Sequence, residues 1–122
     1  MMSRLFRICA LMILTVTTSG WAADFPEGVQ PLKQEKLQSA MAGKVFSVKA
    51  AKGPAWRWQF NSDATFVINI GSYSDSGVWS IKDSSVCQES KRGNTGCNEI
   101  RTKDNILYLQ RDSGEIVILQ IE

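Results

Sequence analysis

The sequence predicts a small all-β domain: an eight-stranded antiparallel meander, closed as a barrel or stacked as a sandwich, with one short N-terminal helix and one disulfide. Three observations support this fold class. Beyond residue 44, short apolar runs recur at near-regular intervals with the alternating polarity of half-buried strands. The connections are rich in Gly, Asp, Asn and Ser and are too short for a crossover helix, so neighbouring strands should pair antiparallel. The chain has 122 residues, enough for a single modest core.

Residues 1–22 are interpreted as a signal peptide. Arg4 and Arg7 give a basic start, and an apolar run follows from Ile8 to Val16. Gly20-Trp21-Ala22 then places small side chains where a signal peptidase requires them, which predicts cleavage after Ala22 or, as second choice, Ala23. The apolar run is shorter than the ~20 residues that span a bilayer. We therefore expect a periplasmic or secreted protein without a membrane anchor once the signal is removed.

The charge of the chain argues against nucleic acid as a partner. The net charge is +2, with 14 basic and 12 acidic residues, and two of the basic residues are Arg4 and Arg7. Residues 23–122 are therefore balanced. A neutral domain without a basic stripe lacks the electrostatic footprint of a nucleic-acid-binding protein.

Residues 23–43 are expected to form a leader and a short helix. Pro31 stands where a helix can begin, Leu32 to Met41 contains good helix formers, and Gly43 ends the run. Leu37, Ala40 and Met41 share one face at helical spacing, which is enough to dock a short helix on the end of a sheet.

Residues 44–122 are expected to form the antiparallel β domain. Its last apolar run, Ile116 to Ile121, would be a sticky exposed edge unless it pairs with Val45 to Lys49. This pairing closes the ring, so we favour the barrel over the sandwich. The eight predicted strands are Val45–Lys49, Trp56–Asn61, Thr65–Ile70, Val78–Lys82, Val86–Glu89, Asn98–Thr102, Ile106–Arg111 and Ile116–Ile121.

A predicted hairpin at residues 56–70 organises this domain. A three-residue loop, Ser62-Asp63-Ala64, pairs Phe60 with Phe66 and Trp58 with Ile68, whereas a two-residue loop would mix the faces of the strands. The usual geometry of a three-residue loop requires its last residue, here Ala64, to be left-handed.

Cys87 and Cys97 are the cysteines that remain after signal removal. In an oxidising compartment, and with no histidine in the chain to complete a metal site, they are expected to form a disulfide. Their spacing does not fit a C-x-x-C redox pair.

Little in the chain predicts chemistry. The absence of histidine excludes Ser-His-Asp and Cys-His arrangements. The aspartates at 63, 75, 83, 104 and 112 all fall in predicted turns, where Asp bonds nearby backbone amides. Asn61 to Thr65 lacks the bidentate Glu of a calcium loop, and no Gly-rich phosphate cradle is present. We therefore expect no enzymatic activity, no metal and no cofactor.

The aromatic residues are the feature of the chain that most suggests a binding role. They either fill a small barrel, the reading we favour, or line a calyx for an apolar ligand. Tyr73, in the polar stretch from Gly71 to Ser76, and the basic pair Lys91-Arg92 are candidates for contact with a partner. The predicted core aromatics are Trp56, Trp58, Phe60, Phe66 and Trp79.

The middle third of the chain resembles a group of small exported bacterial proteins of unknown function. The shared pattern is Trp-x-Phe, Asp-Ala-Thr-Phe, Ser-Gly-Val-Trp-Ser-Ile, Val-Cys and a second Cys, although Ala64 stands where the pattern has glycine. A looser likeness, at the level of fold only, is to exported lysozyme inhibitors, which are small disulfide-stapled β-barrels. The resemblance implies an exported β domain and no activity.

The function expected from the sequence is that of an exported, non-enzymatic binding module. One alternative is an inhibitor or immunity protein directed against a cell-wall hydrolase. Another is a calycin-like carrier of a small apolar ligand. The expected partner is therefore a protein or a small apolar molecule.

Overall fold

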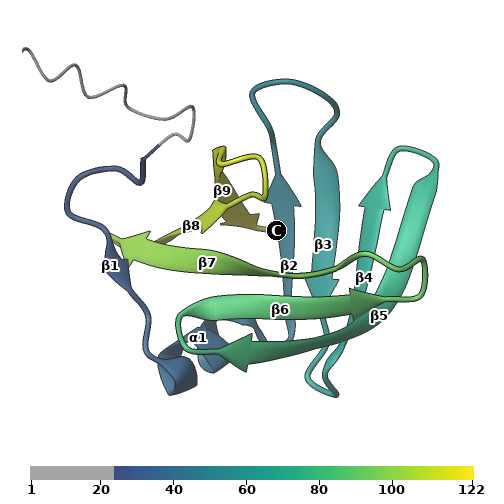
Figure 1. Cartoon of the computed structure of the whole chain (residues 1–122), viewed down its shortest axis with the longest axis horizontal. Coiled ribbons are helices and arrows are strands. Elements are labelled where there is room, and N and C mark those ends of the chain that lie inside the picture. The colour runs from purple at the N-terminus through teal and green to yellow at the C-terminus, as the bar shows by residue number, and fades with distance from the viewer. Residues whose placement is uncertain (1–23) are drawn as a thin grey trace, which may run out of the picture.

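The computed structural model describes residues 24–122 (Figure 1). The predicted signal peptide and its cleavage site lie outside the described residues. The elements are β1 (Gln30–Pro31), α1 (Gln34–Met41), β2 (Lys44–Val48), β3 (Trp56–Phe60), β4 (Thr65–Ile70), β5 (Tyr73–Lys82), β6 (Ser85–Ser90), β7 (Thr95–Lys103), β8 (Ile106–Gln110) and β9 (Ile116–Ile121).

Strands β2 to β9 form a closed antiparallel meander barrel, as the sequence predicted. Each strand pairs with the next in the chain, and β9 returns to β2 to complete the ring. The β2–β9 seam, which was predicted, is short: Phe46 lies opposite Ile121, and Val48 opposite Leu119. The two-residue strand β1, which the sequence did not predict, pairs with β7 through Gln30 and Thr102.

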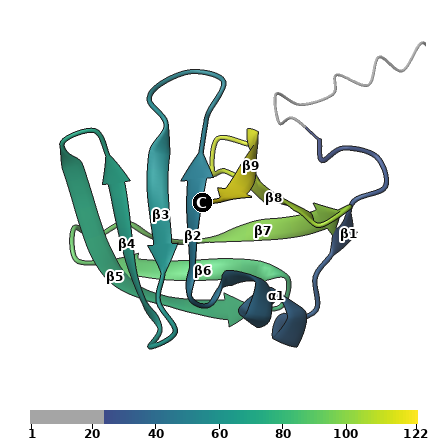
Figure 2. The same ribbon diagram turned by 180° about the vertical axis from the view of Figure 1, so that it is seen from behind.

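The barrel is flattened, with β2, β3 and β4 running across the direction of β6 and β7 (Figures 1 and 2). Strand β5 curves from one group to the other. It needs Gly77, because a Cβ there would collide with the backbone oxygen of Glu89 and lie 2.8 Å from the Cα of Ser90. This close approach lets β5 and β6 stay paired through the curve, a common role of glycine in strands.

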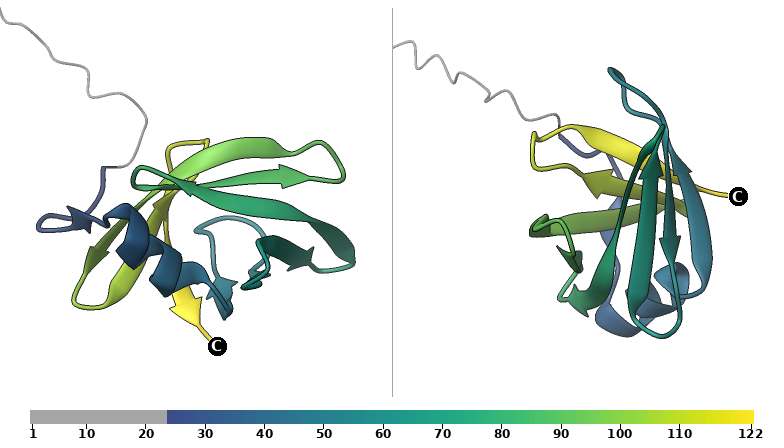
Figure 3. Two further views of the ribbon diagram at one scale, coloured as in Figure 1. Left: turned by 90° about the horizontal axis from the view of Figure 1, so that it is seen from below. Right: turned by 90° about the vertical axis from the view of Figure 1, so that its right-hand side faces the viewer.

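Helix α1 covers one end of the barrel (Figure 3), and its side chains join the core cluster. Leu37 and Met41 of α1 are fully buried, and Ala40 packs against the cluster, as the helical spacing predicted. The ring of Phe60 lies in the middle of the aromatic core, with its centroid 6.0 Å from that of Phe46 and 5.5 Å from that of Trp79.

The organising hairpin has the predicted register. Phe60 lies opposite Phe66 and Trp58 opposite Ile68, and the N–H of Asn61 donates to Thr65 O at 2.8 Å. Ala64 is left-handed, with φ 69°. The loop is also held by Asp63, whose carboxylate accepts the Thr65 hydroxyl and backbone N–H, and these hydrogen bonds lower the pKa of Asp63.

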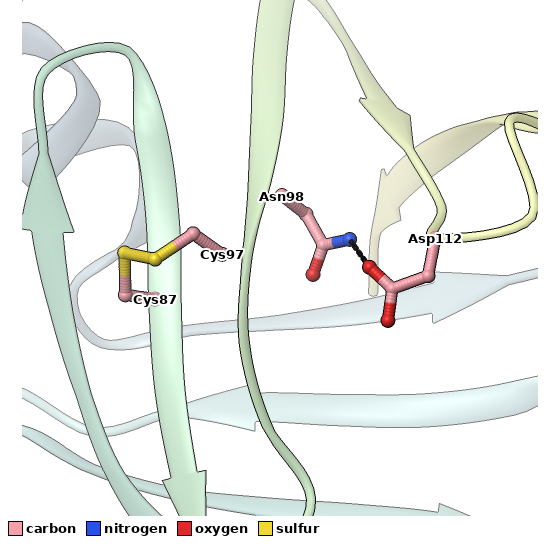
Figure 4. The surroundings of a disulfide bond; sticks show 4 residues. All are labelled: Cys87, Cys97, Asn98 and Asp112. Atoms are coloured by element: carbon pink, nitrogen blue, oxygen red, sulfur yellow. Dashed lines mark hydrogen bonds between the residues drawn. A yellow bond between two sulfur atoms is a disulfide. The ribbon is translucent and has the colours of Figure 1, made fainter.

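The predicted disulfide joins Cys87 of β6 to Cys97 of β7, which lie directly opposite each other. Figure 4 shows it between these strands, while Asn98 lies on the other side of β7 and faces Asp112. Because successive residues of a strand face opposite sides, the disulfide is on the outer surface and Asn98 is inside the barrel.

The seam between β2 and β9 is reinforced by Glu122. Its backbone N–H donates to Val45 O at 3.0 Å. Its carboxylate accepts Arg57 Nε at 2.9 Å and the Ser47 hydroxyl at 3.0 Å. The hydrogen bond from Arg57, followed by that from Ser47, lowers the pKa of Glu122.

No helix within residues 24–122 has the length and apolar character needed to cross a membrane.

Candidate functional site

The end of the barrel opposite α1, here called the open end, carries the β2–β3, β4–β5, β6–β7 and β8–β9 connections. A pocket of about 230 Å³, here called the mouth pocket, lies between them. Its apolar wall comes from β3, β4 and β8: Trp56, Trp58, Ile68, Ile70 and Leu109. Its polar side comes from β7 and the β8–β9 connection: Asn98, Arg111, Asp112 and Ser113.

The apolar wall follows from strand alternation. Trp56, Trp58 and Phe60 share the inner face of β3, and Ile68 and Ile70 share the inner face of β4. Phe60 is buried in the core beside α1, whereas Trp56, at the other end of the same strand, is only half-buried. The predicted aromatics thus both fill the closed half of the barrel and line a pocket at its open end.

Two indole N–H groups in the pocket wall have no hydrogen-bond acceptor among the described residues: Trp56 Nε1 and Trp58 Nε1. Trp58 is only 5% exposed. By contrast, Trp79 Nε1 donates to Asn61 O at 3.0 Å. A buried tryptophan normally pairs its N–H, and leaving such a donor unpaired costs ~1 to 3 kcal/mol.

The rim of the mouth pocket is built by the β8–β9 connection. Arg111 Nη1 donates to Glu115 Oε1 at 3.0 Å, and the Arg111 guanidinium carbon lies 5.1 Å from the centre of the Trp56 ring. Asn98 Nδ2 donates to Gln110 O at 3.0 Å and to Asp112 Oδ1 at 3.2 Å. The charged groups of the rim therefore already have partners within the protein.

A second polar cluster surrounds Asp75, for which the turn prediction was wrong. Asp75 lies within β5 and is 5% exposed. Its Oδ1 accepts the N–H of Ser76 at 2.8 Å and that of Arg92 at 3.3 Å, and its Oδ2 accepts Asn94 Nδ2 at 3.2 Å. Burial alone would raise the pKa of Asp75, but these bonds and one from Ser90 outweigh it and lower the pKa. Asp75 thus fixes the β6–β7 connection to β5.

The loop predicted around Tyr73 is also replaced by strand. The β4–β5 connection contains only Gly71 and Ser72, and Tyr73 begins β5 with 39% of its surface exposed. The Arg92 guanidinium carbon lies 5.0 Å from the centre of the Tyr73 ring, and Arg92 Nε donates to Ser74 O at 2.9 Å. Of the three predicted contact residues, Tyr73 and Arg92 therefore lie together at the open end, with Lys91 exposed beside them.

Sequence reasoning missed Asn98, Arg111 and Asp112 as pocket residues. The register of β7 held a signal for Asn98, because Asn98 alternates with Cys97 and shares the inner face with Ile100. A polar residue on an inner face marks a pocket or a buried network. Arg111 and Asp112 had no such signal, since their role depends on how the β8–β9 connection folds over the barrel.

Other depressions are weaker candidates. The groove beside α1 is larger, about 630 Å³, and is lined mainly by aliphatic residues such as Ile106, Leu107 and Ile118. None of its lining residues, all within the described part of the chain, has a buried polar atom without a partner. Within residues 24–122, no group of three or more His, Cys, Asp or Glu side chains is placed to hold a metal ion.

We compared the chain with protein-family models, with curated proteins and with solved structures, and found no match in any of the three. Its function is therefore inferred from the geometry of the mouth pocket.

Proposed function

We propose that this protein is an exported, non-enzymatic binding module that holds a small apolar ligand in the mouth pocket. The observation that carries the proposal is the pair of buried indole N–H groups, Trp56 Nε1 and Trp58 Nε1, in the apolar wall of the pocket. A concave, largely aromatic site with a few polar groups is the usual form of a small-molecule site.

The size of the pocket limits the ligand. A volume of about 230 Å³ lies just below the ~300 to 1,000 Å³ of typical small-molecule pockets. The mouth pocket therefore takes a molecule about the size of a substituted one-ring or two-ring aromatic compound. Longer ligands would extend between the connections of the open end into solvent.

A second candidate function is contact with a partner protein through Tyr73 and Arg92. The observation that favours it is the exposed Tyr73 ring held against the Arg92 guanidinium. Tyrosine and arginine are enriched at protein interfaces. The hydrolase-inhibitor alternative belongs to this second candidate.

The uncharged two-ring dye 6-propionyl-2-dimethylaminonaphthalene, whose emission moves to shorter wavelength in apolar surroundings, tests ligand binding. We expect saturable, one-to-one binding to the purified protein. Ile70→Trp, which fills the mouth pocket from β4, should weaken binding at least tenfold. Val67→Trp makes a similar increase in size on the outer face of the same strand and should leave binding unchanged.

The dye is excited directly, above the absorption of tryptophan, so that the added indole does not disturb the signal. Equal binding to Ile70→Trp and to the unmodified protein would place the dye elsewhere and contradict the proposal. If no dye binds, and Tyr73→Ala and Arg92→Ala abolish capture of a hydrolase, the second candidate function is the better one.

A further inference from the structure

We infer that the ligand of the mouth pocket is an uncharged molecule that carries a hydrogen-bond acceptor oxygen, such as a ketone, ester or amide carbonyl, on a flat apolar body. Trp58 is the residue that selects it, by donating its indole N–H to that oxygen. This inference rests on the proposed function and names the chemical class of its ligand.

The acceptor follows from the groups that the pocket leaves unpaired. An indole nitrogen only donates, and both Trp56 Nε1 and Trp58 Nε1 are without an acceptor. Elsewhere in the lining Asn98 Nδ2 donates to Asp112 and Arg111 donates to Glu115, so, among the described residues, the buried polar atoms of the pocket without a partner are the two indole nitrogens. The two buried groups that lack a partner are donors, so a ligand can pair with them only through a hydrogen-bond acceptor.

The charges at the rim of the mouth pocket indicate that the ligand is uncharged. Arg111 supplies one positive charge, whereas Asp112 and Glu115 supply two negative charges. An anionic ligand would have to compete with Glu115 for Arg111 and would lie near both carboxylates. A cationic group brings donors only and offers no acceptor to Trp56 Nε1 or Trp58 Nε1.

The flat shape follows from the wall, where two indole rings and the aliphatic side chains of Ile68 and Leu109 face the pocket. Arg111 is the movable part of this site. Its side chain is 40% exposed and is held by a partly exposed ion pair with Glu115 and by its position over Trp56, contacts that contribute little at a solvent-exposed site. Both indole nitrogens are buried with Arg111 in this position, so ligand entry requires that Arg111 moves.

Three probes of nearly the same shape test the inference: acetophenone, α-methylstyrene and benzoate. They present a carbonyl oxygen, a methylene group and a carboxylate at the same position. Binding is followed by the indole N–H resonances of the ¹⁵N-labelled protein, which are assigned with Trp56→Phe and Trp58→Phe. We expect acetophenone to bind about tenfold more tightly than α-methylstyrene, the effect of one hydrogen bond, and more tightly than benzoate.

The resonance of Trp58 Nε1–H should move downfield with acetophenone and not with α-methylstyrene. In Trp58→Phe acetophenone should lose most of its advantage over α-methylstyrene. If that variant does not fold, the resonance in the unmodified protein still decides. Equal binding of the neutral probes to the unmodified protein, or tightest binding of benzoate, would overturn the ligand class while leaving the mouth pocket as a site. If none of the three probes shifts any pocket resonance, the proposed function fails as well.

Discussion

Replacing Ala64 by glycine is expected to stabilise the protein, although most substitutions destabilise. Ala64 has φ 69°, its N–H donates to Asn61 O at 3.2 Å, and its own carbonyl accepts the N–H of Trp79 at 2.8 Å. The residue is therefore held in the left-handed region by hydrogen bonds on both sides. This conformation costs an L-residue with a Cβ ~1 to 2 kcal/mol, whereas it costs glycine almost nothing.

Glycine also makes the unfolded chain more flexible, which costs ~0.4 to 1 kcal/mol of stability. The expected gain for Ala64→Gly is therefore up to about 1 kcal/mol, which for a domain of this size corresponds to a rise in melting temperature of up to ~4 to 8 °C. The matched control is Ala55→Gly. Ala55 is exposed and is not among the positive-φ residues. This variant therefore shows only the stability that is lost because glycine makes the unfolded chain more flexible.

The assay is chemical denaturation of the three proteins under identical conditions. Because both variants change the unfolded chain in the same way, the difference between Ala64→Gly and Ala55→Gly isolates the cost of the left-handed backbone, ~1 to 2 kcal/mol. If the two variants lose the same stability, Ala64 carries no backbone strain and the reasoning is wrong.

Four further expectations concern stability. Gly77→Ala should lower the free energy of unfolding by ~2 to 3 kcal/mol or more. Gly96→Ala is the control and should change it little, because a Cβ at Gly96 meets nothing within 4 Å. Similar losses of stability in the two variants would contradict the close approach of β5 and β6. Cys97→Ser should cost ~2 to 4 kcal/mol, and the native, unreduced protein should resist thiol alkylation. Despite the burial of Asp75, hydrogen bonds to its carboxylate lower its pKa in the folded state. Ionised Asp75 therefore contributes stability above its unfolded-state pKa and loses this contribution as the pH falls through its folded-state pKa. Denaturation midpoints measured from pH 5 to pH 2 should therefore fall less steeply for Asp75→Asn. Deleting residues 115–122 should cause aggregation or failure to fold, and a monomer with an unchanged melting temperature would contradict the closed barrel.

The strand pattern could be predicted because local and global demands agree along most of the chain. Thr65–Ile70 and Ile116–Ile121 were predicted with the bounds that the structure has. The register of the hairpin at Ala64 followed from side-chain pairing alone. Ring closure followed from the apolar last strand, which has no other way to cover its edge.

The prediction went wrong where polar residues lie in a strand at the open end. The segment from Tyr73 to Ser76 has the composition of a loop, yet it pairs with β4 along its whole length. Its polarity is tolerated because Asp75 finds hydrogen bonds from the β6–β7 connection, a contact between distant parts of the chain. The polar side of the mouth pocket was missed for the same reason, since Asn98 and Asp112 meet only in three dimensions.

The β2–β9 seam has a consequence for the order in which the protein folds. Seven of the eight pairings of the ring join strands adjacent in the chain, and only the seam joins segments about 70 residues apart. Closing the short loop of a local hairpin costs little entropy, so such hairpins form fast, whereas strands that are distant in the chain pair slowly. We therefore expect the chain to form a curled open sheet first and to close the seam late. With only Phe46 to Val48 paired to β9, this seam is also where the closed ring is expected to open first.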